Sequence, residues 1–328
     1  MKVFARLKSA YLNGGAPAFR EVYLAAIEES PVHRAMAKLV DRVCPVSQIL
    51  DWSVHLDQLI AQHGPHKAAA IVFKELSVPL EVQIPAGEEH ILRTAPLLLY
   101  GNHPSVVTPL TIAAALDRTD LRMLVAGFFT RLLPASLPFV FPLWVTHRRT
   151  WHDVLGAGLP HALALSLLFY VDELPPPPVA RAHNRAMLSH AVNHIRAGGS
   201  SLIFPGGSTP RDRRWFPGIG ILARELAETK AKSQVYLAPF HVENDSNARC
   251  YSLISAGSLA GVRRTHRNLK PVLVRFERPV LVQDVVPDPT VSTAAVVGLL
   301  RQRYDSRPTP CERFTSPPSP RLPRDRKV

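Results

Sequence analysis

Apolar residues recur at three- and four-residue spacing between residues 17 and 75, a pattern typical of amphipathic helices. Pro31 is placed to begin a second helix and Pro45 to end one, because proline lacks the backbone N–H that a helix interior needs. We therefore expect an N-terminal helical segment over residues 1–77. Its helices can pack on the body of the protein or lie on a lipid surface, and the pattern leaves both open.

From residue 78 the pattern changes to short apolar runs separated by turn residues. These runs predict strands at 78–82, 96–100, 123–126, 143–146, 201–204, 235–239, 272–276 and 280–282. Helical patterns over 184–197 and 220–228 lie between several of them. Buried Leu, Ile and Val runs that alternate with helices indicate the α/β class, with a central, mostly parallel sheet covered by helices over residues 78–290.

Two segments stand outside this pattern. Residues 154–171 carry no formal charge, but Pro160 and His161 interrupt them, so a membrane span, an interfacial helix and a buried helix all stay open. The four prolines at 175–178 predict a stiff, extended connector, and the apolar and proline-rich insertion covers residues 151–180. Arg, Pro, Ser and Thr dominate residues 304–328, which predicts a disordered basic tail.

Composition and charge narrow the class of protein. Hydrophobic residues make up 46% of the chain and the mean hydropathy is +0.03, which excludes a polytopic membrane protein. The formal net charge of +13 suits an anionic membrane surface, a nucleic acid or a phosphorylated substrate about equally well. Cys44, Cys250 and Cys311 form no CxxC pair, so neither a zinc site nor a disulfide framework is predicted. The N-terminus lacks the unbroken apolar run of a secretory signal, and we expect a cytoplasmic protein.

The first stretch with chemical potential is Leu-Leu-Leu-Tyr-Gly-Asn-His-Pro-Ser at 97–105. A buried run is followed by Asn102 and His103 where the chain leaves the sheet. In open α/β sheets the carboxyl ends of strands are where ligands bind, and a histidine there can act as a general base. Taken alone, such a stretch is more often a capping or turn arrangement.

The second stretch is Ser-Leu-Ile-Phe-Pro-Gly-Gly-Ser-Thr-Pro at 201–210, followed by Arg211, Arg213 and Arg214. Glycines let backbone N–H groups approach a ligand closely, and clustered arginines can pair with phosphate. The stretch is not a P-loop, because no Gly-Lys-Ser/Thr follows. An ordinary strand-to-helix loop is the alternative.

Three further stretches complete the set. Residues 215–225 predict a turn and the N-terminus of a helix, which favours a nearby anion. Residues 235–242 predict a strand with Pro239 near its end. Residues 141–149 lead into His147, Arg148 and Arg149, where a phosphate site and a solvated turn are equal alternatives.

In this order the stretches resemble the motifs of the glycerol-3-phosphate and lysophospholipid acyltransferase superfamily. The resemblance covers about residues 78–283, from Asn-His-Pro-Ser at 102–105 through Phe-Pro-Gly-Gly at 204–207 to Arg-Phe-Glu-Arg-Pro-Val at 275–280. It implies a glycerolipid acyltransferase-like fold. It also implies transfer of a fatty acyl group from acyl-CoA or acyl-carrier protein to a hydroxyl of a glycerolipid or lysolipid-like acceptor, as in phospholipid biosynthesis.

The resemblance implies roles for individual residues. In the family, the histidine of an Asn-His-x4-Asp motif is the general base that takes a proton from the acceptor hydroxyl, which makes His103 the catalytic residue. Ala238 and Pro239 would help to shape the acyl site. No metal or resident cofactor is implied, since the acyl carrier is a co-substrate. Substrate or phosphate binding would fall to Asn102, Ser105, Thr108, Arg148, Arg149, Phe204, Pro205, Gly206, Gly207, Ser208 and Arg211.

Two residues depart from the family pattern. Thr108 stands where the family has Asp, and losing the carboxylate of a triad costs on the order of 10⁴ in rate. Gly206 stands where the family has Glu. These departures favour a catalytically attenuated acyltransferase-like protein that binds lipid or partner proteins. They equally favour a branch similar to the diacylglycerol acyltransferases, whose His-Pro-His-Gly and Pro-Gly-Gly blocks lack that Asp. Asp117 and Asp212 are candidates to replace the missing carboxylate.

The expected partners are the acyl donor, the acceptor and an anionic membrane surface. We expect the protein to lie peripherally on the inner face of the membrane. A nucleic acid is not expected, because the sequence has no aromatic-rich basic stripe of the kind that stacks bases.

Overall fold

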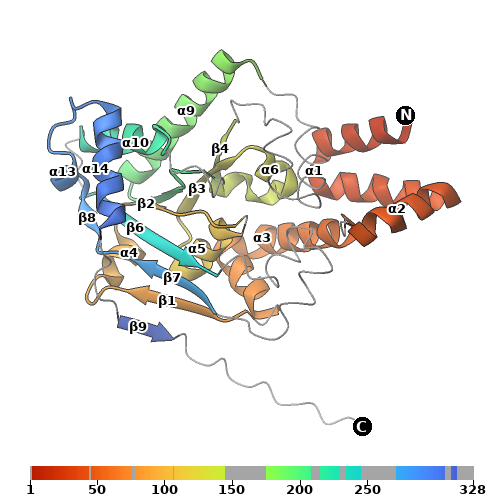
Figure 1. Cartoon of the computed structure of the whole chain (residues 1–328), viewed down its shortest axis with the longest axis horizontal. Helices are drawn as coiled ribbons and strands as arrows, with labels where there is room; N and C mark the ends of the chain where they lie inside the picture. Colours follow the sequence, from red (N-terminus) through yellow and green to blue (C-terminus); the bar gives the residue numbers. More distant parts are fainter. Residues whose placement is uncertain are drawn as a thin grey trace, which may run out of the picture.

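The computed structural model describes residues 2–43, 46–75, 78–105, 107–144, 175–207, 215–228, 234–244, 271–306 and 312–315. The strands form one sheet, and the N-terminal helices α1 (Lys2–Glu29), α2 (Pro31–Val43) and α3 (Val46–Glu75) lie together at one end of it (Figure 1). This arrangement confirms the α/β class with an N-terminal helical segment, and α2 begins at Pro31 as the sequence predicts.

Nine strands of the described chain make up the sheet, in the order β4-β3-β5-β2-β6-β7-β1-β9, with β8 pairing to β6 beside that path. The strands from β4 to β6 are mutually parallel. β7 runs antiparallel to β6, β1 parallel to β7, and β9 antiparallel to β1. The strand bounds are β1 Leu80–Ile84, β2 Leu97–Gly101, β3 Leu121–Ala126, β4 Val140–Leu143, β5 Ser200–Ile203, β6 Tyr236–Glu243, β7 Val272–Phe276, β8 Val280–Leu281 and β9 Glu312–Thr315.

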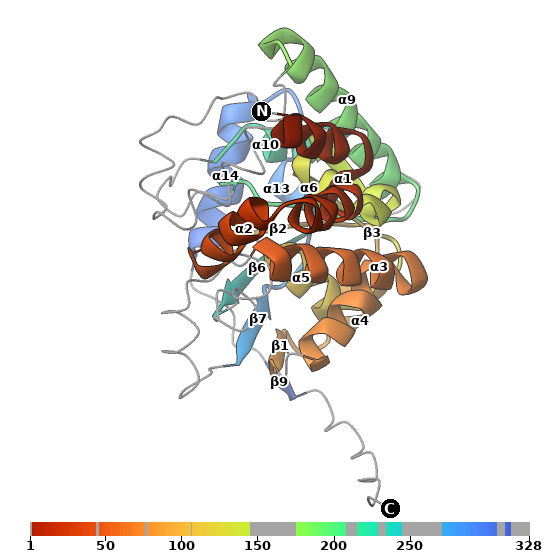
Figure 2. The same ribbon diagram turned by 90° about the vertical axis from the view of Figure 1, so that its right-hand side faces the viewer.

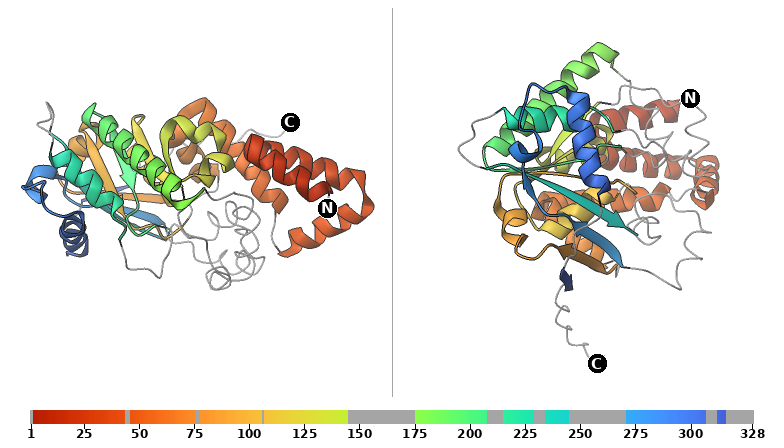
Figure 3. Two further views of the ribbon diagram at one scale, coloured as in Figure 1. Left: turned by 90° about the horizontal axis from the view of Figure 1, so that it is seen from above. Right: turned by 60° about the vertical axis from the view of Figure 1, so that its left-hand side comes forward.

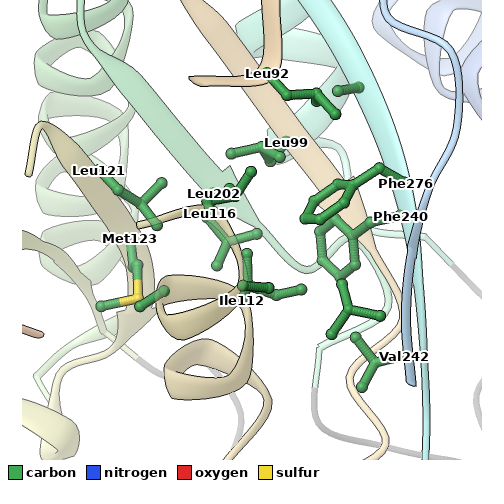
Figure 4. Close-up of a cluster of buried hydrophobic side chains, with 14 of the residues drawn as sticks. Leu92, Leu99, Ile112, Leu116, Leu121, Met123, Leu202, Phe240, Val242 and Phe276 are labelled. Atoms are coloured by element: carbon green, nitrogen blue, oxygen red, sulfur yellow. The ribbon is translucent and has the colours of Figure 1, made fainter. Parts of the chain in front are cut away.

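Helices cover both faces of the sheet, because alternate side chains of a strand point to opposite sides. Leu99 of β2 packs on one face with Phe240, Phe276 and Ile112 of α5 (Figure 4). Tyr100 packs on the other face, which α9, α10 and α14 cover. The remaining helices are α4 Glu89–Thr94, α5 Thr108–Leu116, α6 Phe128–Leu132, the 3₁₀ helix η1 Pro134–Phe139, α9 Pro177–Arg196, α10 Gly218–Ala227, α13 Val282–Val285 and α14 Thr293–Asp305. Burial on both faces explains why β2 is an unbroken apolar run.

The N-terminal helices lie side by side in front of the sheet in Figure 2. α1 and α3 each bend at a glycine with positive φ, 67° at Gly15 and 75° at Gly64. A Cβ at Gly15 would overlap the carbonyl oxygen of Arg131, so α1 approaches α6 more closely than any larger residue allows. The helical segment begins at Lys2, within the predicted range of residues 1–77, although the apolar periodicity is visible only from residue 17.

Prolines account for two boundaries that the sequence analysis predicted wrongly. The strand predicted at 143–146 lies at Val140–Leu143. Among the described strands β4 lies at the edge of the sheet, so Pro142 has no second strand beside it there that would need its N–H. An extended connector was predicted over residues 175–178, but α9 already begins at Pro177. Pro177 and Pro178 occupy the first helical turn, where the missing N–H is not required.

The strand predicted at 235–239 continues to Glu243, which places Pro239 in the middle of β6. On one side β6 pairs with β8 up to Leu237 and with β7 from Phe240 onward, so Pro239 falls between the two ladders. Its carbonyl oxygen accepts a hydrogen bond from the N–H of Glu277 (2.9 Å) on that side. The N–H and C=O of a strand residue point to the same side of the strand. An N–H at position 239 would therefore point into the gap between the β8 and β7 ladders, so the proline removes no ladder hydrogen bond.

The C-terminal part differs from the predicted domain limits. α14 follows residue 290 and packs on α10, so the α/β body extends past the predicted end. β9 lies within the predicted disordered tail and pairs with β1, Phe314 opposite Val82. The run Glu-Arg-Phe-Thr holds a single apolar residue and so gives no strand signal, and only the free edge of β1 gives this strand a partner.

Among the described helices, none combines the length and apolar character needed to cross a membrane. The segment 154–171, for which three interpretations were open, lies outside the described residues.

Candidate functional site

Asn102 and His103 follow β2 at its carboxyl end. A Cβ at Gly101 would overlap the carbonyl oxygen of Phe240, so the end of β2 lies unusually close to β6. The side chain of Asn102 then donates to the carbonyl oxygen of Val242 and accepts from its N–H, both at 2.8 Å. This pair of bonds completes the ladder beyond Gly101. Asn102 therefore fixes the loop that carries His103, whereas the sequence predicted a contact with substrate.

The imidazole of His103 lies against the ring of Phe204, with 4.3 Å between the ring centroids and 31° between the planes. Phe204 in turn meets Phe240 edge-on at 6.0 Å. Phe204 directly follows β5, which is the neighbour of β2 in the sheet. The structure thus brings together the Asn-His-Pro-Ser and Phe-Pro-Gly-Gly stretches, which are about a hundred residues apart in the sequence.

Burial controls the charge of His103. It lowers the pKa of the imidazole to about 4, while the backbone of Ser105 acts more weakly in the opposite direction. The ring is therefore neutral at neutral pH, and its buried Nδ1 has no hydrogen-bond partner among the described residues. In the described ranges, no carboxylate lies within ion-pair distance of His103. The result is an uncharged imidazole that can accept a proton, but only weakly.

Thr108, at the position of the family aspartate, is fully buried at the start of α5. Its hydroxyl donates to the carbonyl oxygen of Ser105 (2.7 Å) and accepts from the N–H of Ser105 (3.1 Å). The hydroxyl of Ser105 accepts from the N–H of Val107 (3.2 Å). Ser105 and Thr108 therefore stabilise the turn into α5, since short polar side chains readily satisfy backbone groups at a helix start. These contacts are structural, in contrast to the substrate contacts that the sequence predicted for both residues.

Asp117 was a candidate to replace the missing carboxylate. It lies at the opposite end of α5 from Thr108, a helix of nine residues and thus about 13 Å long. There Asp117 adopts a left-handed conformation (φ 52°) and approaches His66 of α3 at 3.9 Å. Asp117 therefore serves the contact between α3 and α5, and the structure does not bring it to His103.

The loop after β5 is a tight turn. The N–H of Gly207 donates to the carbonyl oxygen of Phe204 (3.0 Å), and Gly207 has a φ of 61°, which favours glycine. The carbonyl oxygen of Pro205 accepts from the N–H of Phe216 just before α10 (2.8 Å). Gly206 is half-buried within this turn. As predicted, the turn at 215–217 leads into α10, so both stretches border the same end of the sheet.

The remaining predicted site residues fall into two groups. Ala238 is fully buried in the same core as Phe204. The carbonyl oxygen of Pro239 accepts the hydrogen bond from the N–H of Glu277. The predicted phosphate-binding residues Arg148, Arg149, Ser208 and Arg211 lie outside the described residues, and so does Asp212. Within the described ranges, no three His, Cys, Asp or Glu side chains are grouped to hold a metal ion.

A second histidine, which was not predicted from the sequence, lies at this end of the sheet. His241 of β6 lies on the face opposite His103, with its Nε2 3.8 Å from a carboxylate oxygen of Glu277. Its ring stacks on Tyr304 of α14 at 4.3 Å, and the hydroxyl of Tyr304 reaches the backbone of Asn102. Burial lowers the pKa of His241, and Glu277 opposes that shift. Nothing local in the sequence signals this group, because His241, Glu277 and Tyr304 are far apart in the chain.

In comparisons with known proteins, no family model matches the chain and no curated protein matches it either.

Proposed function

We propose that this protein is an acyltransferase, which moves a fatty acyl group from acyl-CoA or acyl-carrier protein to a hydroxyl of a glycerolipid or lysolipid-like acceptor. The observation that carries the proposal is the contact between His103 and Phe204. It places a neutral histidine and a glycine turn at the carboxyl ends of adjacent parallel strands, where α/β proteins bind their ligands. The ordered motifs of the sequence point to the same two elements.

In the proposed reaction, His103 is the general base. Its free imidazole nitrogen takes the proton of the acceptor hydroxyl as that oxygen attacks the thioester carbonyl. The carbon–sulfur bond then breaks, an ester forms, and the thiolate leaves with the proton that the imidazolium returns. The site needs no resident cofactor for this sequence, because the acyl carrier is consumed as a co-substrate.

A second candidate is an attenuated acyltransferase-like protein that binds lipid or partner proteins. The hydrogen bonds between Thr108 and Ser105 favour it, since the hydroxyl at the aspartate position is held by backbone groups. An imidazole whose pKa is about 4 is also a weak base. General-base catalysis is most effective with a pKa near the working pH, so the lowered value predicts slow turnover unless bound substrate raises it.

The partners follow from the proposed reaction. The acceptor is a lipid, so an anionic membrane surface on the cytoplasmic side is where the protein would meet it, and the net charge of +13 suits that surface. A role in phospholipid biosynthesis would follow, and no nucleic acid is required.

The decisive experiment measures thiol release from acyl-CoA and acyl-carrier protein with a panel of lysolipid acceptors. The wild-type protein should release thiol, and His103→Ala should lose that release. His90→Ala is the matched control, because His90 is exposed on α4 and should leave the rate unchanged. Wild-type protein that is inert with every donor and acceptor, yet binds lysolipid, would favour the second candidate.

A further inference from the structure

Helix α2 turns its apolar stripe away from the rest of the protein. Val32, Met36 and Leu39 are spaced by four and three residues, so they share one face of the helix, and they are 66%, 61% and 62% exposed. Amphipathic helices of globular proteins normally bury that face. An unburied stripe of this kind indicates that a partner covers it.

The face of α2 that contacts the protein is small and polar instead. Ala37, about 100° around the helix from Met36, is buried. The Nδ1 of His33 lies 3.2 Å from the carbonyl oxygen of Ala26 in α1. α2 therefore rests on α1 through this side, and its exposed stripe results from the tertiary packing.

Two exposed cations lie on the polar side of α2, about 150° around the helix from the middle of the stripe. Arg34 and Lys38 are spaced by four residues, so they lie in one row on the side of α2 that is neither buried nor apolar. Neither forms an ion pair in the described part of the chain. α2 itself lies at the end of the molecule opposite α13 and α14, and no other described element lies beyond it there (Figures 1 and 3). A flat surface can therefore reach the stripe, and the long side chains of Arg34 and Lys38 can bend back toward that surface.

We propose that α2 docks on an anionic lipid surface, with Val32, Met36 and Leu39 in the outer acyl-chain region and Arg34 and Lys38 at the phosphates. An apolar stripe on one side of a helix, with Lys and Arg on its polar side, is the arrangement by which a helix lies in a membrane interface. A second copy of this chain fits less well, because two chains that each carry a net charge of +13 repel one another. The choice of a lipid partner rests on the proposed function, whereas the docking itself needs no catalysis.

The test is flotation of the full-length protein with phosphatidylcholine vesicles that contain or lack phosphatidylglycerol, without any acyl donor. The wild type should float only with the anionic vesicles. The double variant Met36→Asp/Leu39→Asp should bind them at least about tenfold more weakly, because it removes apolar contact and adds repulsion. Replacing both cations, in Arg34→Gln/Lys38→Gln, should weaken binding about thirtyfold, from about 1 kcal/mol for each cation.

The matched control is Val179→Asp/Leu299→Asp, which adds the same charge at apolar positions 51% and 43% exposed on α9 and α14. It should float like the wild type, and all variants should keep the wild-type circular dichroism because every changed position is exposed. The proposal is overturned if the wild type does not float with anionic vesicles, or if the α2 variants float as well as it does. It is also overturned if the wild type sediments as a dimer that Met36→Asp/Leu39→Asp converts to a monomer, since a second copy then covers the stripe.

Failure of docking and failure of the proposed function can be told apart. Flotation does not depend on His103, and thiol release can be measured with an acceptor dispersed in detergent. A protein that floats but releases no thiol keeps the docking proposal and loses the acyltransferase proposal. A protein that releases thiol but does not float keeps the acyltransferase proposal and loses only the docking proposal.

Discussion

His103 and His241 lie at the same end of adjacent strands, on opposite faces of the sheet, and their surroundings differ in one respect. Burial lowers the pKa of both imidazoles. His241 has a carboxylate of Glu277 at 3.8 Å, whereas the neighbours of His103 are the ring of Phe204 and the backbone of Ser105. Burial alone makes a histidine neutral, and only a nearby carboxylate makes a buried imidazole a stronger base.

His241, which has the nearby carboxylate, is the stronger base, and it lies on the face of the sheet that lacks the motif residues. The stretches that resemble the acyltransferase family meet at His103, while the histidine–carboxylate pair lies behind them, against Tyr304. The proposed function depends on position, because His103 borders the glycine turn after β5. If the stronger base carried out the reaction instead, His241 would be the catalytic residue. Substitutions at the two histidines separate position from basicity.

The largest expected difference is between His103→Gln and His241→Gln. Loss of a general base lowers kcat/KM by about 10²–10⁴-fold, so we expect that loss for His103→Gln and a change within about tenfold for His241→Gln. Steady-state thiol release under equal folding, checked by circular dichroism, measures both. The reverse ranking would move the catalytic role to His241 and its carboxylate.

A carboxylate placed near His103 should reduce the difference in pKa between His103 and His241. In Thr108→Asp the new negative charge should raise the pKa of His103 by about 1–3 units and increase kcat. The pKa is measured by NMR titration of the imidazole Cε1–H. Thr108→Ser is the control, because it keeps the hydroxyl that bonds to Ser105. A pKa near the wild-type value would show that a side chain at this position does not reach the ring.

The low pKa of His103 also predicts how stability depends on pH. The folded value of about 4 is below the unfolded value of 6.5, so this contribution is fully present above about pH 6.5 and is lost as pH falls through about pH 4. Between about pH 7 and about pH 5 the wild type should lose about 2 kcal/mol of unfolding free energy from this group. Urea unfolding at both values measures it, with His103→Gln as the reference. Equal losses in the two proteins would rule out a depressed pKa.

The smallest expected effect is at Glu277. Glu277→Gln removes the negative charge that favours protonated His241, so the pKa of His241 should fall further, by about 1 unit. The pKa of His103 should stay unchanged, because Glu277 contacts His241 on the opposite face of the sheet. NMR titration of both histidines in one sample decides this. A shift at His103 would mean that the two faces are electrostatically coupled.

Much of the fold could be predicted because its signals are local. β7 lies where an apolar run predicts it, and β2 is buried on both faces as its unbroken Leu run indicates. The errors occur where a neighbouring strand or helix overrides a local preference. Pro142 and Pro239 are tolerated in strands because of where their partners end, and β9 exists only beside the edge of β1.

The candidate site was predictable in position and less so in its contacts. His103 was expected at a strand end and lies there, next to the second predicted stretch. The sequence could not show that Asn102 bonds to Val242, or that Thr108 bonds to Ser105, because polar side chains bind whichever backbone group the fold leaves nearby. The pair of His241 and Glu277 was missed for the same reason.

By itself, the sequence determined the α/β class, the helical N-terminal segment and the location of His103 at the end of a buried strand, since these follow from periodicity and from the residues that end each run. Tertiary structure alone decided which residues meet His103, because the order of strands places residue 204 beside residue 103. Tertiary structure also decided that the side chains of Val32, Met36 and Leu39 on α2 are exposed to solvent. An apolar stripe is visible in the sequence, but the direction in which it points depends on how α2 packs against α1.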